Sequence, residues 1–468
     1  MKKYLIFIGI LSTLLTSCDN YVDIQTEGKL VPKETGNYRY ILNNTYTFNN
    51  TYDLLDVASD DITVRDDHAN YFNLYYANSA YYQPFMQTYK WSDQIIPVGE
   101  PDYAMNSLYT ALYNCNVIIT EVMNSTNGTD AERLAIKGEA QVHRAYVFLT
   151  LINTFGKAYD PATSATDPGV PLFTTPTVDA NITRASVKDV YDLIVKDLTE
   201  AITSGLKPVQ TGRNVAFPSK ASAYALLART NLYMGNYADA QRNAESALAL
   251  QNKLLNLEDY ENVGDYSWPL TYEDPEIILS KKSGGYQYAP TLLSLSDELL
   301  NSFDTKDLRY QLYTRSVSAM SFGSLTEGRA YSKELLSGDG RNAGPTVPEL
   351  YVIKAECEAR AGNAGAAMNT INTLRKTRFK AADYTDLTAT DANDALIKVL
   401  AERRKELMGR GGFRWADLKR LNRDPRFAKT ITHKYLTQTF TIEPGGNRYQ
   451  FPFAEIYFDY APNLQQNK

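Results

Sequence analysis

Residues 223–247 carry a pattern of small residues that admits few structures. The positions that define it are Ala223–Ala228, Gly235, Ala240, Ala244 and Ala247. Alanines three or four residues apart share one face of a helix, and their short side chains let two helix backbones approach closely. Glycine adopts the left-handed conformation that often ends a helix, so Gly235 predicts a turn. The pattern predicts two antiparallel helices packed across small residues.

The same order of features returns more than a hundred residues later in the chain. Its positions are Tyr351, Ala355, Gly362-Asn363, Ala367, Ile371 and Leu374. Both units resemble the tetratricopeptide repeat, a pair of antiparallel helices that meet across small residues. Because such units bury one another's faces, the separated pairs must come together in space. The predicted fold class is mostly α, a tetratricopeptide-like helix-pair scaffold with long irregular, aromatic-rich loop insertions and a few short strands.

Another pair of helices is predicted upstream. Residues 132–155 place apolar side chains at steps of three and four, and Gly156 ends that helix. The next helix begins at Ser186, because a serine followed three residues later by Asp189 can satisfy the free amides of a helix start. Its apolar stripe runs from Val187 to Leu198. We expect these two helices to pack together.

Two stretches lack helical periodicity and are rich in aromatic residues. Residues 255–345 contain many Tyr, Ser, Gly and Pro, with short strand-like runs such as Glu276–Ser280. Residues 40–100 are similar, with the aromatic cluster Tyr71–Tyr76, then Tyr81-Tyr82 and Trp91. Long irregular insertions in a compact protein are usually functional or disordered, and loops on rigid helices often carry binding sites. With 35 Tyr against 17 Phe, the chain favours rings that are flat and also wettable.

The first eighteen residues are typical of an export signal. Lys2 and Lys3 precede an apolar run from Tyr4 to Leu15, and Cys18 follows Leu-Thr-Ser. The run is about 12 residues long, short of the roughly 20 that a membrane-spanning helix needs. The last four positions resemble a bacterial lipobox, in which the cysteine thiol takes a diacylglycerol and becomes the new N-terminus. A plain secretory signal with an incidental Cys18 is the alternative.

The predicted organisation follows from these segments. We expect a lipoprotein signal peptide at 1–17, a lipidated N-terminus with a flexible tether at 18–33, and a single body at 34–468. Within the body, residues 34–250 hold helix pairs, 255–345 form a loop-rich ligand-binding insertion, and 346–468 form a C-terminal helix pair and signature region.

Charge and motif content exclude several functions. A net charge of −6 and a pI near 5.4 disfavour nucleic acid as a partner, since it attracts a basic face. The three histidines are dispersed, and Cys115 and Cys357 lack neighbouring ligands, so neither a metal site nor a disulfide framework is predicted. Asp60-Asp61 could supply an acid and a base, but adjacent carboxylates in polar loops are mostly solvated. We therefore predict no catalytic residues and no cofactor, and acid–base hydrolysis is the least favoured function.

The C-terminal third contains a series of distinctive segments: Pro348–Glu356, Gly362-Asn363, Leu374-Arg375, Glu402–Leu407, Arg414–Arg420, Phe451–Ile456 and Pro462–Asn467. In these segments the chain resembles the SusD/RagB family of surface nutrient-binding lipoproteins. Upstream, Gly138–Ala140, Arg144–Tyr146 and Phe155-Gly156 are similar to the family's first long helix.

Two segments of the chain depart from the family pattern. Arg410-Gly411 stands where the family usually has Glu-Gly, with Gly412 as an apparent insertion, and Pro452–Ala454 replaces Pro-Ile-Pro.

The charged residues within these signatures have a structural explanation. They are Arg403, Arg404, Arg414 and Asp417. A helix and turn so rich in both signs of charge can pair internally, and we interpret these residues as structural.

The resemblance implies a non-enzymatic protein, lipid-anchored on the outer face of the outer membrane. It would cap a SusC-like TonB-dependent transporter and capture a glycan for import. A peptide-binding member of the same family is the first alternative, and a repeat scaffold that binds proteins without a small ligand is the second.

A sugar site needs flat rings for the apolar face of the sugar and polar groups for its hydroxyls. Tyr286 and Tyr288, which follow the flexible run 283–285, resemble in position the aromatic loop of glycan-binding family members. The other predicted ligand-binding residues are Trp91 with Asp60, Asp61 and Arg65, and Trp268.

Overall fold

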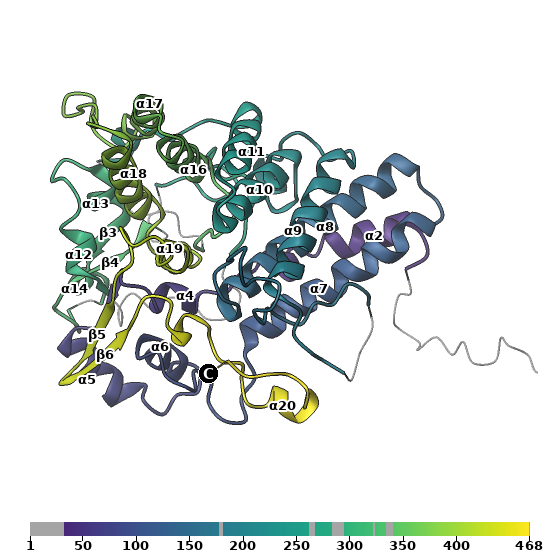
Figure 1. Ribbon diagram of the computed structural model, residues 1–468, viewed down its shortest axis with the longest axis horizontal. Coiled ribbons are helices and arrows are strands. Elements are labelled where there is room, and N and C mark those ends of the chain that lie inside the picture. Colours follow the sequence, from purple (N-terminus) through teal and green to yellow (C-terminus); the bar gives the residue numbers. More distant parts are fainter. Residues whose placement is uncertain are drawn as a thin grey trace, which may run out of the picture.

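The structure is a computed structural model, and it describes residues 32–176, 181–261, 267–282, 294–321, 323–333 and 340–467. The predicted lipidation site Cys18 and the predicted ligand residues Tyr286 and Tyr288 lie outside these ranges. Within them the chain forms 18 α-helices and three two-stranded antiparallel sheets (Figure 1). The predicted fold class, mostly α with a few short strands, is confirmed.

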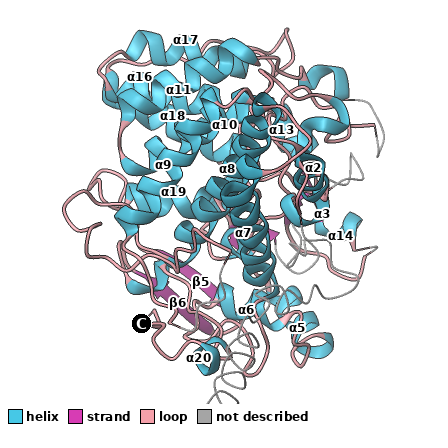
Figure 2. Ribbon diagram, turned by 90° about the vertical axis from the view of Figure 1, so that its right-hand side faces the viewer, coloured by secondary structure: helices cyan, strands magenta, loops and turns pink. Residues whose placement is uncertain are grey.

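A row of paired helices forms the scaffold (Figures 1 and 2). Its members are α7 (Tyr103–Glu121), α8 (Asp130–Phe155), α9 (Val187–Thr203), α10 (Lys220–Met234), α11 (Tyr237–Leu250), α16 (Val347–Arg360), α17 (Ala364–Arg375), α18 (Ala392–Leu407) and α19 (Phe413–Leu421). Neighbours pack in the order α7, α8, α9, α10, α11, α16 and α17, so the two pairs that the sequence separates are joined in space by α11 and α16.

The local signals read from the sequence lie where they were predicted. The Ser186 hydroxyl accepts a hydrogen bond from the Asp189 amide at the start of α9. Gly156 follows the last residue of α8. Gly235 and Gly362 end α10 and α16 with φ angles of 82° and 88°, in the left-handed region. The predicted helix pairs are therefore confirmed, including the pairing of α8 with α9.

Alanine allows the close packing of α10 and α11. The alanines on the facing sides of the two helices, Ala228, Ala240, Ala244 and Ala247, are completely buried. A larger side chain at any of these positions would force the two backbones apart, because protein interiors are close-packed.

The remaining elements are short, and many of them lie in the segments 40–100 and 255–345 that were predicted to be irregular. The helices are α2 (Thr35–Leu42), α3 (Thr45–Phe48), α4 (Leu54–Val57), α5 (Asp66–Tyr75), α6 (Gln83–Tyr89), α12 (Asp297–Leu300), α13 (Leu308–Tyr313), α14 (Val317–Met320) and α20 (Tyr457–Tyr460). Four 3₁₀ turns are described, η3 (Val122–Asn124), η4 (Gly212–Ala216), η5 (Leu257–Tyr260) and η6 (Asn447–Tyr449). The prediction of an irregular chain over residues 40–100 is thus wrong in part.

Three short antiparallel strand pairs are described, of which the first joins distant parts of the chain and the other two join neighbouring segments. β1 (Ile62–Thr63) pairs with β2 (Ser294–Leu295), β3 (Thr314–Ser316) with β4 (Arg329–Tyr331), and β5 (Ile431–Tyr435) with β6 (Gln438–Ile442). The predicted strand at 276–280 does not form, because its main chain makes an isolated bridge between Ile277 and Thr346 and then bonds to Val215, so no continuous ladder with one partner develops. Whether a short apolar run forms a strand depends on a pairing partner, and the run itself does not specify that partner.

The described residues form one large hydrophobic core, from Tyr38 to Leu464, and two smaller clusters, one of them between α16, α17 and α18. Trp415 of α19 is fully buried in it, with its ring centre 4.7 Å from that of Tyr449. No helix of the described ranges combines the length and the apolar character needed to cross a membrane.

Candidate functional site

Asp60 and Asp61, predicted to bind ligand, lie between α4 and β1 and are buried. Asp60 accepts hydrogen bonds from Arg414 Nε and Nη2 at 2.7 and 2.8 Å, and Lys429 Nζ lies 2.7 Å from its carboxylate. Asp61 accepts one from Arg404 Nε at 2.6 Å. The two carboxylates therefore fasten the segment before β1 to α18 and α19.

The pKa values of the two carboxyl groups are shifted in opposite directions. Burial opposes the charge on Asp60, yet Arg414, Arg404 and Lys429 hold its pKa well below the ordinary value. Burial raises the pKa of Asp61 in spite of Arg404, and repulsion from Asp60 contributes to the rise. Together with the ion pair between Arg403 and Asp417 at 2.7 Å, these contacts confirm that the charged signature pairs internally.

Trp91 lies in the core and is only 6% exposed. Its indole N–H donates to the carbonyl of Ala58 at 3.0 Å, and its ring stacks on His433 with centres 4.1 Å apart. The buried indole is thus held by a hydrogen bond and a stacking contact within the protein, which gives Trp91 a structural role. Its predicted contact with ligand stays a prediction.

Arg65 and Trp268 also have partners within the protein. Arg65 donates to the carboxylate of Asp297, at the start of α12, from both terminal nitrogens. Trp268 is 4% exposed, between the rings of Tyr260 and Tyr313, and lines a small cavity of about 40 Å³. The structure does not bring the predicted residues Trp91, Arg65 and Trp268 together around one open site; their predicted ligand contacts stay predictions.

Five tyrosine rings form a continuous surface on α5 and the loop that follows it. We call this set the tyrosine chain, and its members are Tyr75, Tyr71, Tyr76, Tyr82 and Tyr81. Successive ring centres in that order are 4.6, 5.9, 4.3 and 4.9 Å apart. Tyr75 and Tyr81, at the two ends, are 62% and 47% exposed, and the three rings between them are half-buried.

The tyrosine chain rests on a well-anchored helix. The first turn of α5 is held to the segment before β4, since Asp67 accepts from the amides of Thr326 and Glu327 at 2.8 and 3.2 Å. Its middle is held to the β5–β6 hairpin by the Tyr435 hydroxyl, which donates to Asn73 Oδ1 at 2.6 Å. Tyr71 packs on a small apolar cluster that includes Val317.

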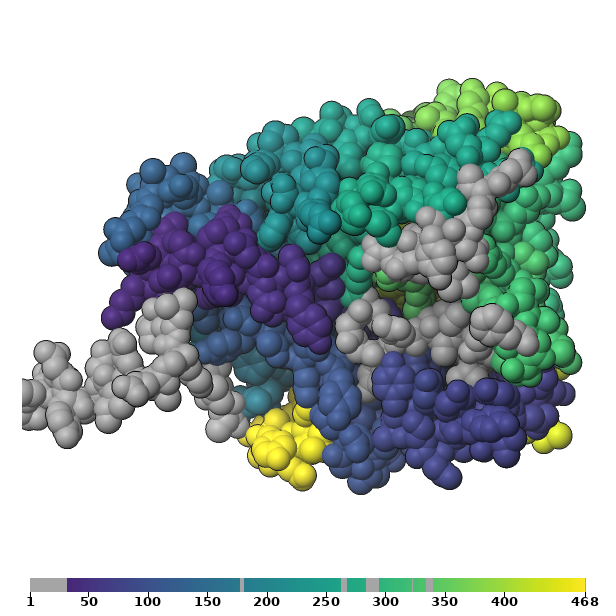
Figure 3. Space-filling view, turned by 180° about the vertical axis from the view of Figure 1, so that it is seen from behind, coloured from purple at the N-terminus to yellow at the C-terminus, as the bar shows by residue number. Residues whose placement is uncertain are grey.

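The segment that carries this surface lies on the outside of the molecule. In Figure 3 the dark-blue atoms of α5 and the residues after it form the lower edge of the molecule, beside the green segment that carries α12 to α14. The exposed polar residues Asn73 and Asn78 lie within the same stretch of chain. The site therefore combines exposed flat rings with amide groups that can form hydrogen bonds.

The sequence carried a signal for this surface that the predicted residue set did not use. Tyr71 and Tyr75 are four residues apart, which places them on one face of a helix, and Tyr81 and Tyr82 follow after a short turn. Because an irregular segment has no helical face, the prediction of an irregular chain at 40–100 does not include the face that Tyr71 and Tyr75 share.

The described residues offer no ready metal site. Among them, no three His, Cys, Asp or Glu side chains lie close enough together to hold an ion. Cys115 and Cys357 are buried, and burial raises the pKa of each thiol to about 12, so both thiols are held in their protonated form.

The fold and its surface define a helix-pair scaffold protein with an exposed aromatic platform. Two family profiles match the sequence. The profile described as "Starch-binding associating with outer membrane" matches residues 20–232, and that of the SusD family matches residues 347–467. The chain belongs to the SusD family, which confirms the resemblance seen in the C-terminal signatures.

Solved structures show the same fold over almost the whole chain. A SusD superfamily protein from Bacteroides thetaiotaomicron VPI-5482 is 21% identical, with a TM-score of 0.70, and the match covers 93% of this chain and 100% of the other. A putative sugar binding protein from Bacteroides vulgatus ATCC 8482 is 19% identical, with a TM-score of 0.69 and coverages of 94% and 99%.

The description of a further solved structure names the glycan that the protein binds. A laminarin binding SusD-like protein is 16% identical, with a TM-score of 0.65 and coverages of 93% and 99%. A search of curated protein sequences finds no match.

Proposed function

We propose that this protein is a non-catalytic glycan-binding protein and that the tyrosine chain is the platform on which the glycan lies. The observation that carries the proposal is the continuous contact of five rings, with Tyr75 and Tyr81 exposed at its ends. Family membership supports it, as does the laminarin bound by one protein of the same fold.

The physical argument rests on the shape and stiffness of the rings. A pyranose presents apolar C–H groups on its face and hydroxyls at its edge, so it can lie on an aromatic ring and form hydrogen bonds around it. Each ring of the chain is held by its neighbours, which reduces the conformational entropy that binding would otherwise remove. Because Tyr75 and Tyr81 are connected through three further rings, the platform suits several sugar units in a row.

The wider biological setting is also part of the proposal. The family description that matches residues 20–232 includes association with the outer membrane. We place the signal peptide at 1–17, the lipid on Cys18, the tether at 18–33 and the body at 34–468. The anchored protein would stand on the cell exterior and deliver glycan to a SusC-like TonB-dependent transporter.

Calorimetric titration tests the ligand class. The purified protein is titrated with a panel of polysaccharides, their oligosaccharides and mixed peptides. Replacement of both Tyr75→Ala and Tyr81→Ala is expected to weaken glycan binding about tenfold or more, since each ring contact is worth about 0.5–1.5 kcal/mol and 1.4 kcal/mol is tenfold.

A matched control separates stacking from general loss of tyrosine. Tyr46→Ala with Tyr460→Ala removes two rings that are 87% and 75% exposed and lie outside the tyrosine chain, so glycan affinity is expected to stay the same. Tyr286→Ala with Tyr288→Ala tests the loop predicted from the sequence in the same assay. Binding of peptides alone would establish the peptide alternative and refute the glycan platform.

A further inference from the structure

The stretch of sequence that carries the tyrosine chain has no charged side chain of its own. Residues 68–89 contain no Asp, Glu, Lys or Arg, although these four types make up 22% of the whole sequence. The one titratable group of the stretch besides its tyrosines is His68, which is fully buried, with Nε2 3.1 Å from the carbonyl oxygen of Glu327. The polar groups that this stretch presents around the rings are therefore amides and hydroxyls.

Cations of the protein lie over many of its other aromatic rings. The guanidinium of Arg329, for example, lies 4.5 Å from the ring centre of Tyr310. Lys90, the first charged residue after the stretch, is placed in the same way, 3.9 Å from the ring centre of Tyr435. In the described part of the chain, no contact of this kind involves a ring of the tyrosine chain. The faces of these rings are thus not used by cations of the described residues.

The end of α5 at which the rings lie is unfavourable for an anion. Tyr71 and Tyr75 lie in the second half of this helix and Tyr76 is its C-cap, and the last carbonyls of a helix carry a partial negative charge. No basic side chain lies in the last turn of α5 to offset that charge. The charged residues of the helix itself are acidic, Asp66 and Asp67 in its first turn. An anion that approaches the platform therefore meets negative charge on α5.

The exposed amides of the stretch match the hydroxyls of a neutral sugar. They belong to Asn70, Asn73 and Asn78. A side-chain amide both donates and accepts hydrogen bonds, and so does a hydroxyl group. A carboxylate or a sulfate only accepts, so it leaves each amide oxygen facing another acceptor. Moving such an anion from water onto apolar rings without a cationic partner is costly.

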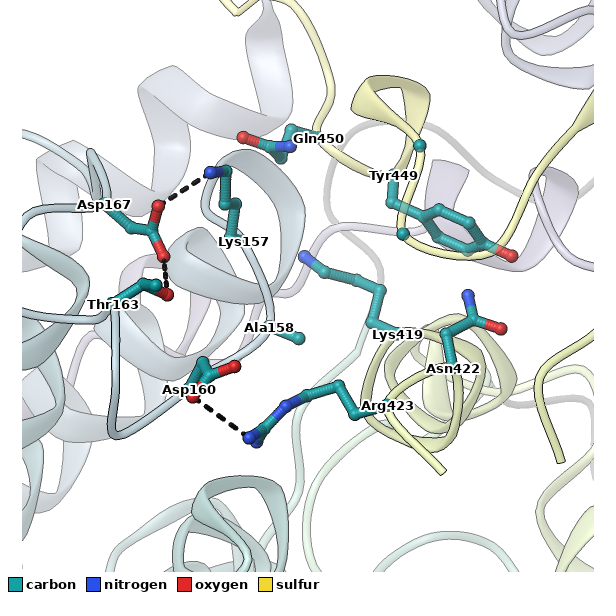
Figure 4. A pocket seen from close by; sticks show the side chains of 12 residues that line it. Lys157, Ala158, Asp160, Thr163, Asp167, Lys419, Asn422, Arg423, Tyr449 and Gln450 are labelled. Carbon is teal, nitrogen blue, oxygen red and sulfur yellow. Dashed lines mark hydrogen bonds and ion pairs between the residues drawn. The ribbon is translucent and has the colours of Figure 1, made fainter. Parts of the chain in front are cut away.

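Charged groups gather instead in a cavity elsewhere in the fold. It measures about 180 Å³ and lies between the segment after α8, the end of α19 and η6 (Figure 4). Lys157 pairs there with Asp167 at 2.7 Å and Arg423 with Asp160 at 3.1 Å, while Lys419 donates to two main-chain carbonyls. These charged groups have partners within the protein, so this cavity does not replace the cations that the tyrosine chain lacks.

We propose that the tyrosine chain selects glycans that carry no charge, and that it discriminates against glycans with uronic acid, sulfate or phosphate groups. This inference rests on the proposed function, because it names the class of glycan that the platform takes. The rings bind the apolar faces of the sugars, and the amides pair with their hydroxyls. An anionic substituent finds no cation in the stretch and faces the negative end of α5.

Calorimetry with glycans that differ in charge alone tests this inference. The probes are laminarin, pullulan and galactomannan, each compared with the same glycan after oxidation of its C6 hydroxyls to carboxylates. We expect each neutral glycan that binds to do so at least about tenfold more tightly than its oxidised form. The affinity of the neutral form should not change with salt, whereas that of the oxidised form should rise, because salt screens the repulsion.

A variant that adds a cation tests the cause directly. Asn78→Lys changes an exposed residue between Tyr76 and Tyr81 in the sequence. It is expected to strengthen binding of the oxidised glycans about twofold to fivefold, the range of an exposed ion pair, and to leave binding of the neutral forms unchanged. The control is Asn369→Lys, which makes the same change of charge at an exposed position of α17 and should alter neither affinity. The unfolding midpoint of each variant shows whether it is folded.

The outcomes separate this inference from the proposed function. Oxidised glycans that bind as tightly as the neutral ones, and lose affinity in Tyr75→Ala with Tyr81→Ala, would overturn the selection for uncharged glycans and keep the platform. No binding of any glycan, or glycan binding that the double variant leaves unchanged, would refute the proposed function and this inference with it. An equal gain for neutral and oxidised forms in Asn78→Lys would refute charge as the cause of the selection.

Discussion

Replacing Asp60 by asparagine tests whether this residue is a structural clamp. Asp60→Asn keeps the size of the side chain and removes one charge that faces three cations, Arg414, Lys429 and Arg404. Arg404 keeps Asp61 and Glu298, and Lys429 keeps Glu298. Arg414 keeps only a carboxylate oxygen of Asp61 at 3.9 Å, so its guanidinium loses its close ion pair.

The structure sets the size of the effect. Breaking a buried ion pair usually costs about 3–5 kcal/mol, because the remaining charge is left without compensation. The Arg414 side chain is 15% exposed and keeps some solvent, which favours the lower end of that range. We therefore expect the free energy of unfolding to fall by about 3 kcal/mol in Asp60→Asn.

Urea unfolding followed by tryptophan fluorescence is a suitable assay. Trp91, Trp268 and Trp415 are all buried, so unfolding exposes each of them to water. The control is Asp130→Asn, which breaks an exposed pair with Arg133 and is expected to cost less than about 1 kcal/mol. A loss below about 1 kcal/mol for Asp60→Asn would refute the clamp, and weaker glycan binding at unchanged stability would return Asp60 to the ligand site.

Two further predictions concern pH and backbone conformation. Burial lowers the pKa of Lys281, whose ammonium donates to His143 Nδ1 at 2.8 Å, to about 7, as it does for Lys419. Each lysine binds a proton in the unfolded chain up to about pH 10.4 but not in the folded chain above 7, so stability should rise between pH 7 and about 8.5 by about 1.4 kcal/mol per pH unit per lysine. Above about 8.5 the buried thiols of Cys115 and Cys357, which stay protonated only in the folded chain, oppose this rise. Denaturant unfolding across this range checks it: Lys281→Met should flatten the slope by one proton, and an unchanged slope would contradict the assignment. Gly412→Ala should destabilise the fold by about 2 kcal/mol or more, since Gly412 has a φ of 71° and a Cβ there would lie 2.5 Å from that of Leu55. Gly36→Ala is the control, because a Cβ at Gly36 meets open space and its φ is ordinary. Both variants are measured by denaturant unfolding, and equal stability of the two would contradict the predicted strain at Gly412.

The scaffold was predictable because its signals are local. A helix cap such as Ser186 and a helix-ending glycine such as Gly235 act on groups within a few residues. The spacing of Ala240, Ala244 and Ala247 indicates a contact face without naming the partner helix. Such signals specify helices and their pairing with the next helix along the chain.

The candidate site was harder to predict because its residues depend on distant partners. From the sequence, Asp60 looks like a solvated loop residue. In the structure it is buried against Arg414, which lies 354 positions later in the sequence. Trp91 looks like an exposed ring, and it is buried because His433 stacks on it. No pattern within a few residues of Asp60 or Trp91 reveals these contacts.

The arginines Arg404 and Arg414 are connected to the tyrosine chain through β1. Arg404 and Arg414 hold the residues just before β1, and Arg65, just after it, is paired with Asp297. Because β1 leads directly into α5, Arg404 and Arg414 help to position the helix that carries Tyr71 and Tyr75. Variants at Arg404 or Arg414 should therefore weaken glycan binding only in proportion to their loss of stability, whereas changes at the exposed rings should weaken binding and leave stability unchanged.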